Sequence, residues 1–165
     1  MKLSHLSLIA CLFASTQAMA LSTDRDQPVH IYSDTQQLDM QSNQVTFAGD
    51  VKLKQGSIAI NADKVIVTRS KADGSIQKIE GYGDLATFSQ LTDDGKTLYG
   101  EAKELYYEVS VDQLTMIDEA MLSQDDSEIR GPKIRYKISS QKLIADGKQK
   151  GDRVSTVLQP QAVQE

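Results

Sequence analysis

The sequence is poor in the residues that carry covalent chemistry. Its 165 residues include one cysteine and no tryptophan, and aromatic residues make up only 5%. Because Cys11 lies in the apolar N-terminal stretch, the rest of the chain has no thiol nucleophile, no thiolate metal ligand and no internal disulfide. We therefore expect the protein to fold by burial of apolar side chains alone.

Histidine is also scarce. His30 is the only histidine beyond the N-terminal apolar stretch, and we expect it to point outward from a strand between Val29 and Ile31. A Ser-His-Asp arrangement would need this residue, and no Cys/His cluster for zinc is present. The acidic pairs Asp93-Asp94 and Asp125-Asp126 lie in turn sequences without the spacing of a calcium loop. The sequence predicts no catalytic residue, no metal site and no cofactor, and indicates a binding protein.

No apolar run is long enough to span a bilayer, which takes about 20 residues. The N-terminus, MKLSHLSLIACLFASTQAMA, has a lysine, a short apolar run and a small-x-small site at Ala18-Met19-Ala20. This layout predicts a secretory signal peptide over residues 1–20. Leu8-Ile9-Ala10-Cys11 also resembles a lipoprotein signal, but few apolar residues precede Cys11 and the apolar run continues past it. We therefore favour cleavage after Ala20.

The predicted mature chain, residues 21–165, has the size of one domain, with a short flexible tail from about residue 160. The formal net charge of the whole chain is −5. An acidic surface repels nucleic acids and anionic membranes, so neither is expected as a partner. We expect an exported, soluble protein.

What the sequence does contain is alternation with a period of two. Segments rich in Val, Ile, Thr, Tyr and Phe recur between short turn sequences, while helical spacing is scarce. Residues 101–108 could begin a helix, but their continuation, VSVDQLTM, is β-branched and alternating, so we interpret the whole run as strand. The chain is therefore predicted to be all-β, a sandwich or jelly roll of many short strands.

The stretch 45–69, VTFAGDVKLKQGSIAINADKVIVTR, alternates but changes phase twice. The first change, at Gln55-Gly56-Ser57, predicts a tight hairpin turn. The second, at Asp63-Lys64, has no glycine or proline and predicts a β-bulge or a corner. Both changes keep the apolar side chains on one face. The stretch therefore predicts a curved sheet that folds over on itself.

A weak repeat supports this interpretation. Residues 60–67 (INADKVIV), 100–107 (GEAKELYY) and 131–136 (GPKIRY) each place a small residue before spaced apolar positions. Their unequal separation argues against a solenoid and favours one hairpin unit reused with different loop lengths. Pro132 has no N–H group, which predicts a local edge or bulge.

Four stretches resemble the OstA-like family, whose members are periplasmic proteins of lipopolysaccharide transport in Gram-negative bacteria. The stretches are DQPVHIYSD (26–34), VTFAGDVKLKQGSIAINADKVIVTR (45–69), IEGYGDLATF (79–88) and VSTVLQP (154–160). The resemblance covers roughly residues 24–160. It implies a slightly twisted, open β-jelly roll of about sixteen antiparallel strands, V-shaped in cross-section. Its apolar inner groove would hold the acyl chains of lipopolysaccharide.

The resemblance also implies lipid-binding residues. The family motifs place them at Val29, Phe88, Tyr107 and Val109. Four further candidates occupy alternating strand positions that are predicted to face inward: Ile31, Phe47, Ile60 and Met116. For each of the added residues, packing in a core without ligand contact is an equally good interpretation.

The implied partners are lipopolysaccharide, the inner-membrane component LptC at the N-terminal edge, the outer-membrane component LptD at the C-terminal edge, and further copies stacked end to end. We hypothesise that residues 27–33 and 154–158 are the two joining edges. The edge residues are Gln27, Val29, Ile31, Val154, Thr156 and Leu158. The chain departs from the family pattern at residues 117–119 and 131–133, which leaves the geometry of residues 117–135 open.

A different class of function remains open at this point. An exported β-sandwich could bind glycan or act as an envelope scaffold without any lipid groove. An enzyme is the third possibility, since a pair of carboxylates for glycoside hydrolysis would leave no recognisable motif. The resemblance favours lipid carriage over both.

Overall fold

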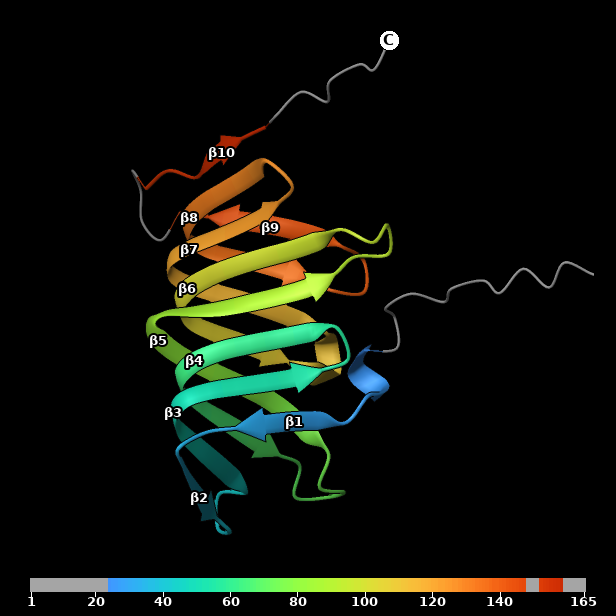
Figure 1. Cartoon of the computed structure of the whole chain (residues 1–165), viewed down its shortest axis with the longest axis vertical. Helices are drawn as coiled ribbons and strands as arrows, with labels where there is room; N and C mark the ends of the chain where they lie inside the picture. The colour runs from blue at the N-terminus through green and yellow to red at the C-terminus, as the bar shows by residue number, and fades with distance from the viewer. Residues whose placement is uncertain (1–23, 148–151, 159–165) are drawn as a thin grey trace, which may run out of the picture.

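The computed structural model describes residues 24–147 and 152–158, which form a ten-stranded antiparallel sheet (Figure 1). The predicted signal peptide and the predicted tail from about residue 160 lie outside the described residues. In chain order the elements are η1 (Asp24–Asp26), β1 (Val29–Tyr32), β2 (Thr35–Asp39), β3 (Gln44–Gln55), β4 (Ile58–Arg69), β5 (Ile76–Leu91), β6 (Thr97–Glu108), η2 (Val109–Val111), β7 (Gln113–Gln124), β8 (Ser127–Lys137), β9 (Lys142–Asp146) and β10 (Ser155–Val157).

The sheet is folded into two layers by its six long strands, β3 to β8. The C-terminal half of β3 pairs with β1 and its N-terminal half pairs with β2. At the other end, the two halves of β8 pair with β10 and β9. The first layer therefore runs from β1 to β10 and the second from β2 to β9. In Figure 1 the first layer lies in front of the second, and the long strands turn from one to the other at the left.

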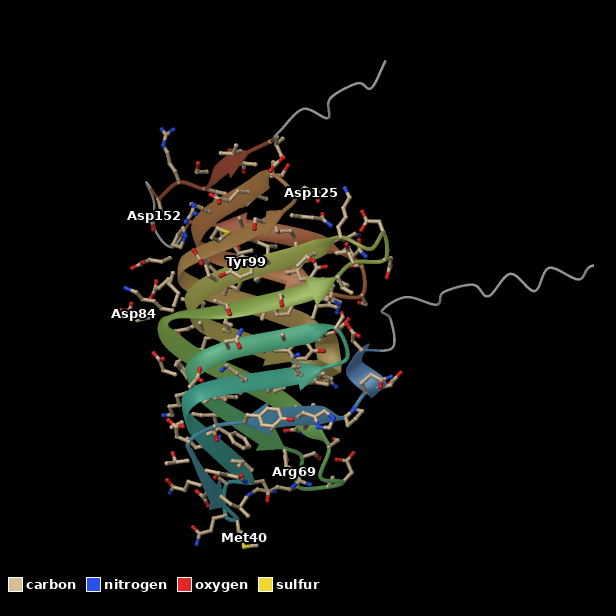
Figure 2. The ribbon with its side chains drawn as sticks, in the orientation of Figure 1. Met40, Arg69, Asp84, Tyr99, Asp125 and Asp152 are labelled. Atoms are coloured by element: carbon tan, nitrogen blue, oxygen red, sulfur yellow. The ribbon has the colours of Figure 1, made fainter. Side chains whose placement is uncertain are left out.

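The turn from layer to layer follows one line across the sheet, which we call the bend line. Pairing is interrupted there between each long strand and the next. The interruptions lie between Ala48 and Val51, Asn61 and Lys64, Tyr82 and Ala86, Glu101 and Glu104, and Ile117 and Ala120. Figure 2 shows Asp84 at this side of the molecule and Asp125, in the turn between β7 and β8, on the opposite side.

The bend line keeps the apolar face inward by adding residues to the strands. On β4 the single residue Asp63 has no pairing partner, so the inward set changes from Ile58 and Ile60 to Val65 and Val67. One added residue reverses the phase of alternation, and the bend brings the apolar set back to the inside. The predicted hairpin at residues 55–57 and the predicted bulge at Asp63-Lys64 are both confirmed.

The weak sequence repeat marks the same line. Its three copies contain Asp63 on β4, Lys103 on β6 and Pro132 on β8, and each of these residues is skipped by the pairing on both sides. The bulge predicted at Pro132 is therefore confirmed. The departures from the family pattern at residues 117–119 and 131–133 fall on the bend line too, with regular pairing resuming beyond it.

Two predictions need correction, and one strand was missed. The sheet has ten strands, not about sixteen, because each long strand continues through the bend; sixteen results only if the two segments of each are counted separately. Residues 109–111 form a 3-10 turn, because Asp112 adopts a positive φ of 52° and the chain reverses there. Strand β2 was not predicted, since all five of its residues are exposed and show no alternation.

The layers pack directly against each other in a core of apolar side chains. A β-carbon on Gly100 of the first layer would lie 2.8 Å from Met116 Sδ of the second. On Gly81 of the second layer it would lie 3.6 Å from Ile60 Cγ2 of the first. The largest fully buried side chains are Tyr107, Phe88, Leu53, Ile58, Ile60, Ile79, Leu105, Leu114, Met116 and Ile134.

The backbone at the bend predicts that replacing Gly49 with alanine lowers stability more than replacing a glycine in an open turn. Gly49 has a φ of +85°, and its β-carbon would lie 2.2 Å from Asp34 Oδ2 and 2.7 Å from Asp34 Cβ. We expect Gly49→Ala to lower the free energy of unfolding by about 3 kcal/mol, from backbone strain and steric clash together. Urea unfolding followed by circular dichroism measures this loss.

The matched control is Gly95→Ala. Gly95 has a φ of +77° but no atom within 4 Å of the added β-carbon, so only backbone strain remains, about 1 kcal/mol. Equal losses for the two variants would contradict the assigned role of the Gly49 bend.

Candidate functional site

Four of the candidate lipid-binding residues lie deep between the layers. Phe88 and Ile60 face inward from the first layer, where they are paired neighbours on β5 and β4. Tyr107 and Met116 face inward from the second layer, on β6 and β7. None of the four is more than 2% exposed. In this structure they are packed core, and an acyl chain can reach them only if the layers separate.

The other four candidates lie at the margins of the core. Val29 and Ile31 on β1, Phe47 on β3 and Val109 in η2 are partly buried and pack against the buried cluster. Val29 and Val109 line one cavity at the N-terminal end of the sheet. The eight candidates thus form a set that extends from the N-terminal edge into the middle of the interior.

The side opposite the bend line carries a row of cavities, and we call it the open side. Its middle cavity, the mouth cavity, is lined by Asp24, Ile58, Gln90, Leu91, Thr92, Asp93, Tyr107, Asp112, Tyr136, Ile138, Ser139 and Gln141. A C-terminal cavity shares Thr92, Tyr136 and Gln141 with it and adds Leu98, Leu122, Ser123, Gln124, Ser127, Glu128, Ile129, Leu143 and Leu158. With the cavity at Val29 and Val109, these openings follow the open side from one end to the other.

Three hydrogen bonds at the mouth cavity each stay within one layer. Tyr107 Oη donates to Asp112 Oδ1 at 3.2 Å, both in the second layer. In the first layer, Leu91 N donates to Ser57 Oγ at 3.2 Å, and Ser57 N donates to Asp24 Oδ1 at 2.8 Å. The long strands join the layers at the bend line, while none of these three bonds connects the layers at the mouth.

Tyrosine ionisation is suppressed at this opening. Burial raises the pKa of Tyr136 to about 12, and the negative charges of Asp112 and Asp93 contribute further. The tyrosine therefore stays neutral and keeps its apolar ring in the interior at physiological pH.

The predicted joining edges lie at opposite ends of the first layer. Residues 29–32 form β1 and residues 155–157 form β10, so both edges are strands. Val29 and Ile31 share the inward face of Leu53 and Gln55, and Thr156 shares that of Ile129. Gln27 precedes β1 and accepts a hydrogen bond on its carbonyl from Gln55 Nε2. Val154 and Leu158 flank β10, with Leu158 in the C-terminal cavity.

Comparison with known families identifies the protein family. Residues 30–142 match the family model described as LptA/(LptD N-terminal domain) LPS transport protein. The chain belongs to this family. Its shared role is lipopolysaccharide transport, and the predicted resemblance is confirmed.

Individual relatives agree over most of the chain. The lipopolysaccharide export system protein LptA of Escherichia coli (strain K12) is 48% identical over 154 residues, 93% of this chain and 83% of that protein. LptA of Haemophilus influenzae is 41% identical over 161 residues, 97% and 93% of the two chains. A crystal structure of LptH, the LptA homologous periplasmic component of the transport device from Pseudomonas aeruginosa, superposes with a TM-score of 0.76. It is 25% identical and covers 84% of this chain and 99% of its own.

The family fold is open, antiparallel and all-β, and the described residues contain no helix long and apolar enough to cross a membrane. Sequence reasoning found the apolar residues of the interior but missed its polar margin. Asp24, Gln55, Gln90 and Asp112 are all at most 6% exposed. The sequence did contain a signal for Gln90, because Ala86, Phe88 and Gln90 occupy alternate positions of β5. A residue that continues an inward-facing alternation is buried by its position even when its side chain is polar.

The raised pKa of Tyr136 predicts an alkaline loss of stability. Unfolded tyrosine ionises near pH 10, while the folded residue keeps its proton to about pH 12. The folded state then binds more protons than the unfolded state, so the free energy of unfolding falls as pH rises from about 10 to 12. We expect Tyr136→Phe to reduce this decline, as measured by urea unfolding at pH 9, 10 and 11.

Tyr32→Phe is the control, because Tyr32 is exposed on β1. An identical decline in the wild type and in Tyr136→Phe would show that Tyr136 does not contribute to it.

Proposed function

We propose that the protein binds the acyl chains of lipopolysaccharide between its two layers. It would carry this lipid across the periplasm, as one element of an end-to-end protein bridge from the inner to the outer membrane. The observation that carries the proposal is the row of cavities along the open side, which lies between two apolar faces that extend from β1 to β8 and β9. Family membership supplies the ligand class.

The energetics favour such a site. Each acyl CH₂ removed from water contributes about 0.8 kcal/mol. Lipid chains replacing core contacts between the layers would recover the apolar burial that is lost when the layers separate. The bend line allows this, because each long strand passes through it as one chain while the layers meet elsewhere through side chains. No catalytic group is needed for this role.

The strand order is compatible with end-to-end assembly. The first layer passes through an even number of antiparallel segments, so β1 and β10 run in opposite directions. A translated second copy would therefore place its β1 antiparallel to β10 of the first copy. Such β-augmentation turns an exposed edge into a joint. We propose that the β1 edge meets LptC, and that the β10 edge meets the next copy or LptD.

Export to the periplasm completes the proposal. The N-terminal stretch MKLSHLSLIACLFASTQAMA would direct secretion and be removed after Ala20. The mature chain would then associate with both membranes through its partners only.

Photo-crosslinking tests the interior site. A benzoylphenylalanine at Phe88 or Tyr107 should form a covalent adduct with lipopolysaccharide under ultraviolet light, because both positions face between the layers. The same probe at Lys52, whose side chain is 57% exposed on β3, should form none. Adducts are detected on a denaturing gel with an antibody to lipopolysaccharide. Equal labelling at Lys52 and at the interior positions would refute the site.

Truncation tests the joining edge. Removal of residues 154–165 deletes β10 and should abolish concentration-dependent chains in gel filtration, because the β1 edge of the next copy loses its partner strand. The far-ultraviolet circular dichroism spectrum should remain that of a β-protein, since β10 pairs with β8 alone. Unchanged chain formation would rule out β10 as the joint.

The closed interior also suits an envelope scaffold without a groove, since Phe88, Tyr107, Ile60 and Met116 are packed as in an ordinary sandwich. The crosslinking experiment separates the two functions. A scaffold would give no lipid adduct at any position.

A further inference from the structure

One buried acceptor at the mouth cavity lacks a donor. Gln90 is the last inward residue of β5, after Ala86 and Phe88, and is 5% exposed. Its Oε1 is buried and has no hydrogen-bond partner among the described residues. A buried amide oxygen without a donor costs free energy, so such atoms are rare in folded proteins and often mark the place of an absent group.

Gln90 belongs to a row of glutamines along the open side. Gln55 on β3, Gln90 on β5 and Gln124 on β7 all face inward at the open end of their strands, and Ile58 and Leu98 occupy the strands between them. The flanking amides are engaged: Gln55 Nε2 donates to Gln27 O at 3.1 Å, and Gln124 Nε2 donates to Thr92 Oγ1 at 3.0 Å. Gln90 is the glutamine of this row that lines the mouth cavity, and its Oε1 is the acceptor considered for a ligand there.

The surroundings of Gln90 define the group that would fit. On its inner side lie the apolar Phe88 and Ile58, and on its outer side the mouth cavity opens to water. An occupant must therefore be apolar on one side and polar on the other, with a hydrogen-bond donor at the boundary.

Charge excludes an anion from this position. Asp24, Asp93 and Asp112 line the mouth cavity, and its described lining contains no lysine or arginine. A phosphate group would be repelled by these carboxylates and would find no cation to pair with. The donor must therefore belong to a group without negative charge, and an amide N–H meets this condition.

We propose that Gln90 Oε1 recognises the amide N–H that links an acyl chain to an amino sugar. This inference rests on the proposed function, and it specifies that the protein recognises the linkage between the acyl chain and the sugar. An ester-linked chain has the same apolar body but no donor at the boundary, so it would leave the acceptor unpaired. The site therefore selects amide-linked over ester-linked chains.

The experiment compares two fluorescent probes that differ at one linkage. The first carries an NBD-labelled dodecanoyl chain on the 2-amino group of glucosamine, and the second carries the same chain as an ester on the 2-hydroxyl of glucose. Fluorescence anisotropy gives the affinity of each probe for the full-length protein. We expect the wild type to bind the amide probe roughly 5- to 10-fold more tightly, the value of one net hydrogen bond.

Gln90→Met should reduce this ratio to about one by weakening amide binding while leaving ester binding unchanged. Gln77→Met is the control, since Gln77 is an exposed glutamine of the same strand, and it should keep the wild-type ratio. If Gln90→Met still binds the amide probe more tightly than the ester probe, the inference is overturned. Binding of the ester probe in that case still supports the proposed lipid site. Equal weakening of both probes also overturns it, by pointing to a sugar hydroxyl. Failure of both probes to bind any variant overturns the proposed function itself.

A second measurement separates ligand recognition from a structural role. Replacing an unpaired buried acceptor with an apolar side chain of similar shape is neutral or stabilising. The urea midpoint of Gln90→Met without ligand should therefore equal or exceed that of the wild type. A lower midpoint would show that Gln90 serves the fold.

Discussion

The rest of the structure depends on one constraint: each long strand must turn a corner without turning its apolar face outward. Because side chains alternate along a strand, an unpaired residue such as Asp63 reverses the phase just where the bend reverses the direction of the inside. Lys103 and Pro132 do the same on β6 and β8. Small residues beside the line, such as Ala62, Ala86 and Ala102, let the layers meet closely. A flat sheet of these strands would leave its apolar face in water.

The same constraint bears on the proposed lipid site, because the interior that would bind the acyl chains is a packed core in this structure. At the bend line the layers are joined covalently, because each long strand runs from one layer into the other there. Away from it they meet through apolar side chains, which are non-directional and exchange one apolar partner for another at little cost. The molecule resembles a hinge whose closed form is stabilised by the contacts that an acyl chain would replace. The short end strands β1, β2, β9 and β10 leave both layers open to extension.

Period-two alternation was sufficient to predict most of this fold. It gave the all-β class, the hairpin at Gly56, the bulge at Asp63 and the inward orientation of the buried candidates Phe88, Tyr107, Ile60 and Met116. It could not reveal the bend at Gly49-Asp50, because two added residues leave the phase unchanged. It missed β2, whose exposed edge has no apolar face, and the buried Gln90, whose polarity suggests a surface. Alternation also cannot distinguish a closed core from an open groove, because both have the same inward residues.

The central claim is that the layers part at the open side to admit a lipid chain, and a reversible lock tests it most directly. Asp93 and Ser139 are exposed and line the mouth cavity from opposite layers. In the form lacking Cys11, cysteines at both positions can be joined by a bis-maleimide linker with a cleavable disulfide. The account predicts that the linked protein takes up no fluorescent lipopolysaccharide and that cleavage of the linker restores uptake. Equal uptake by the linked and cleaved forms would contradict it.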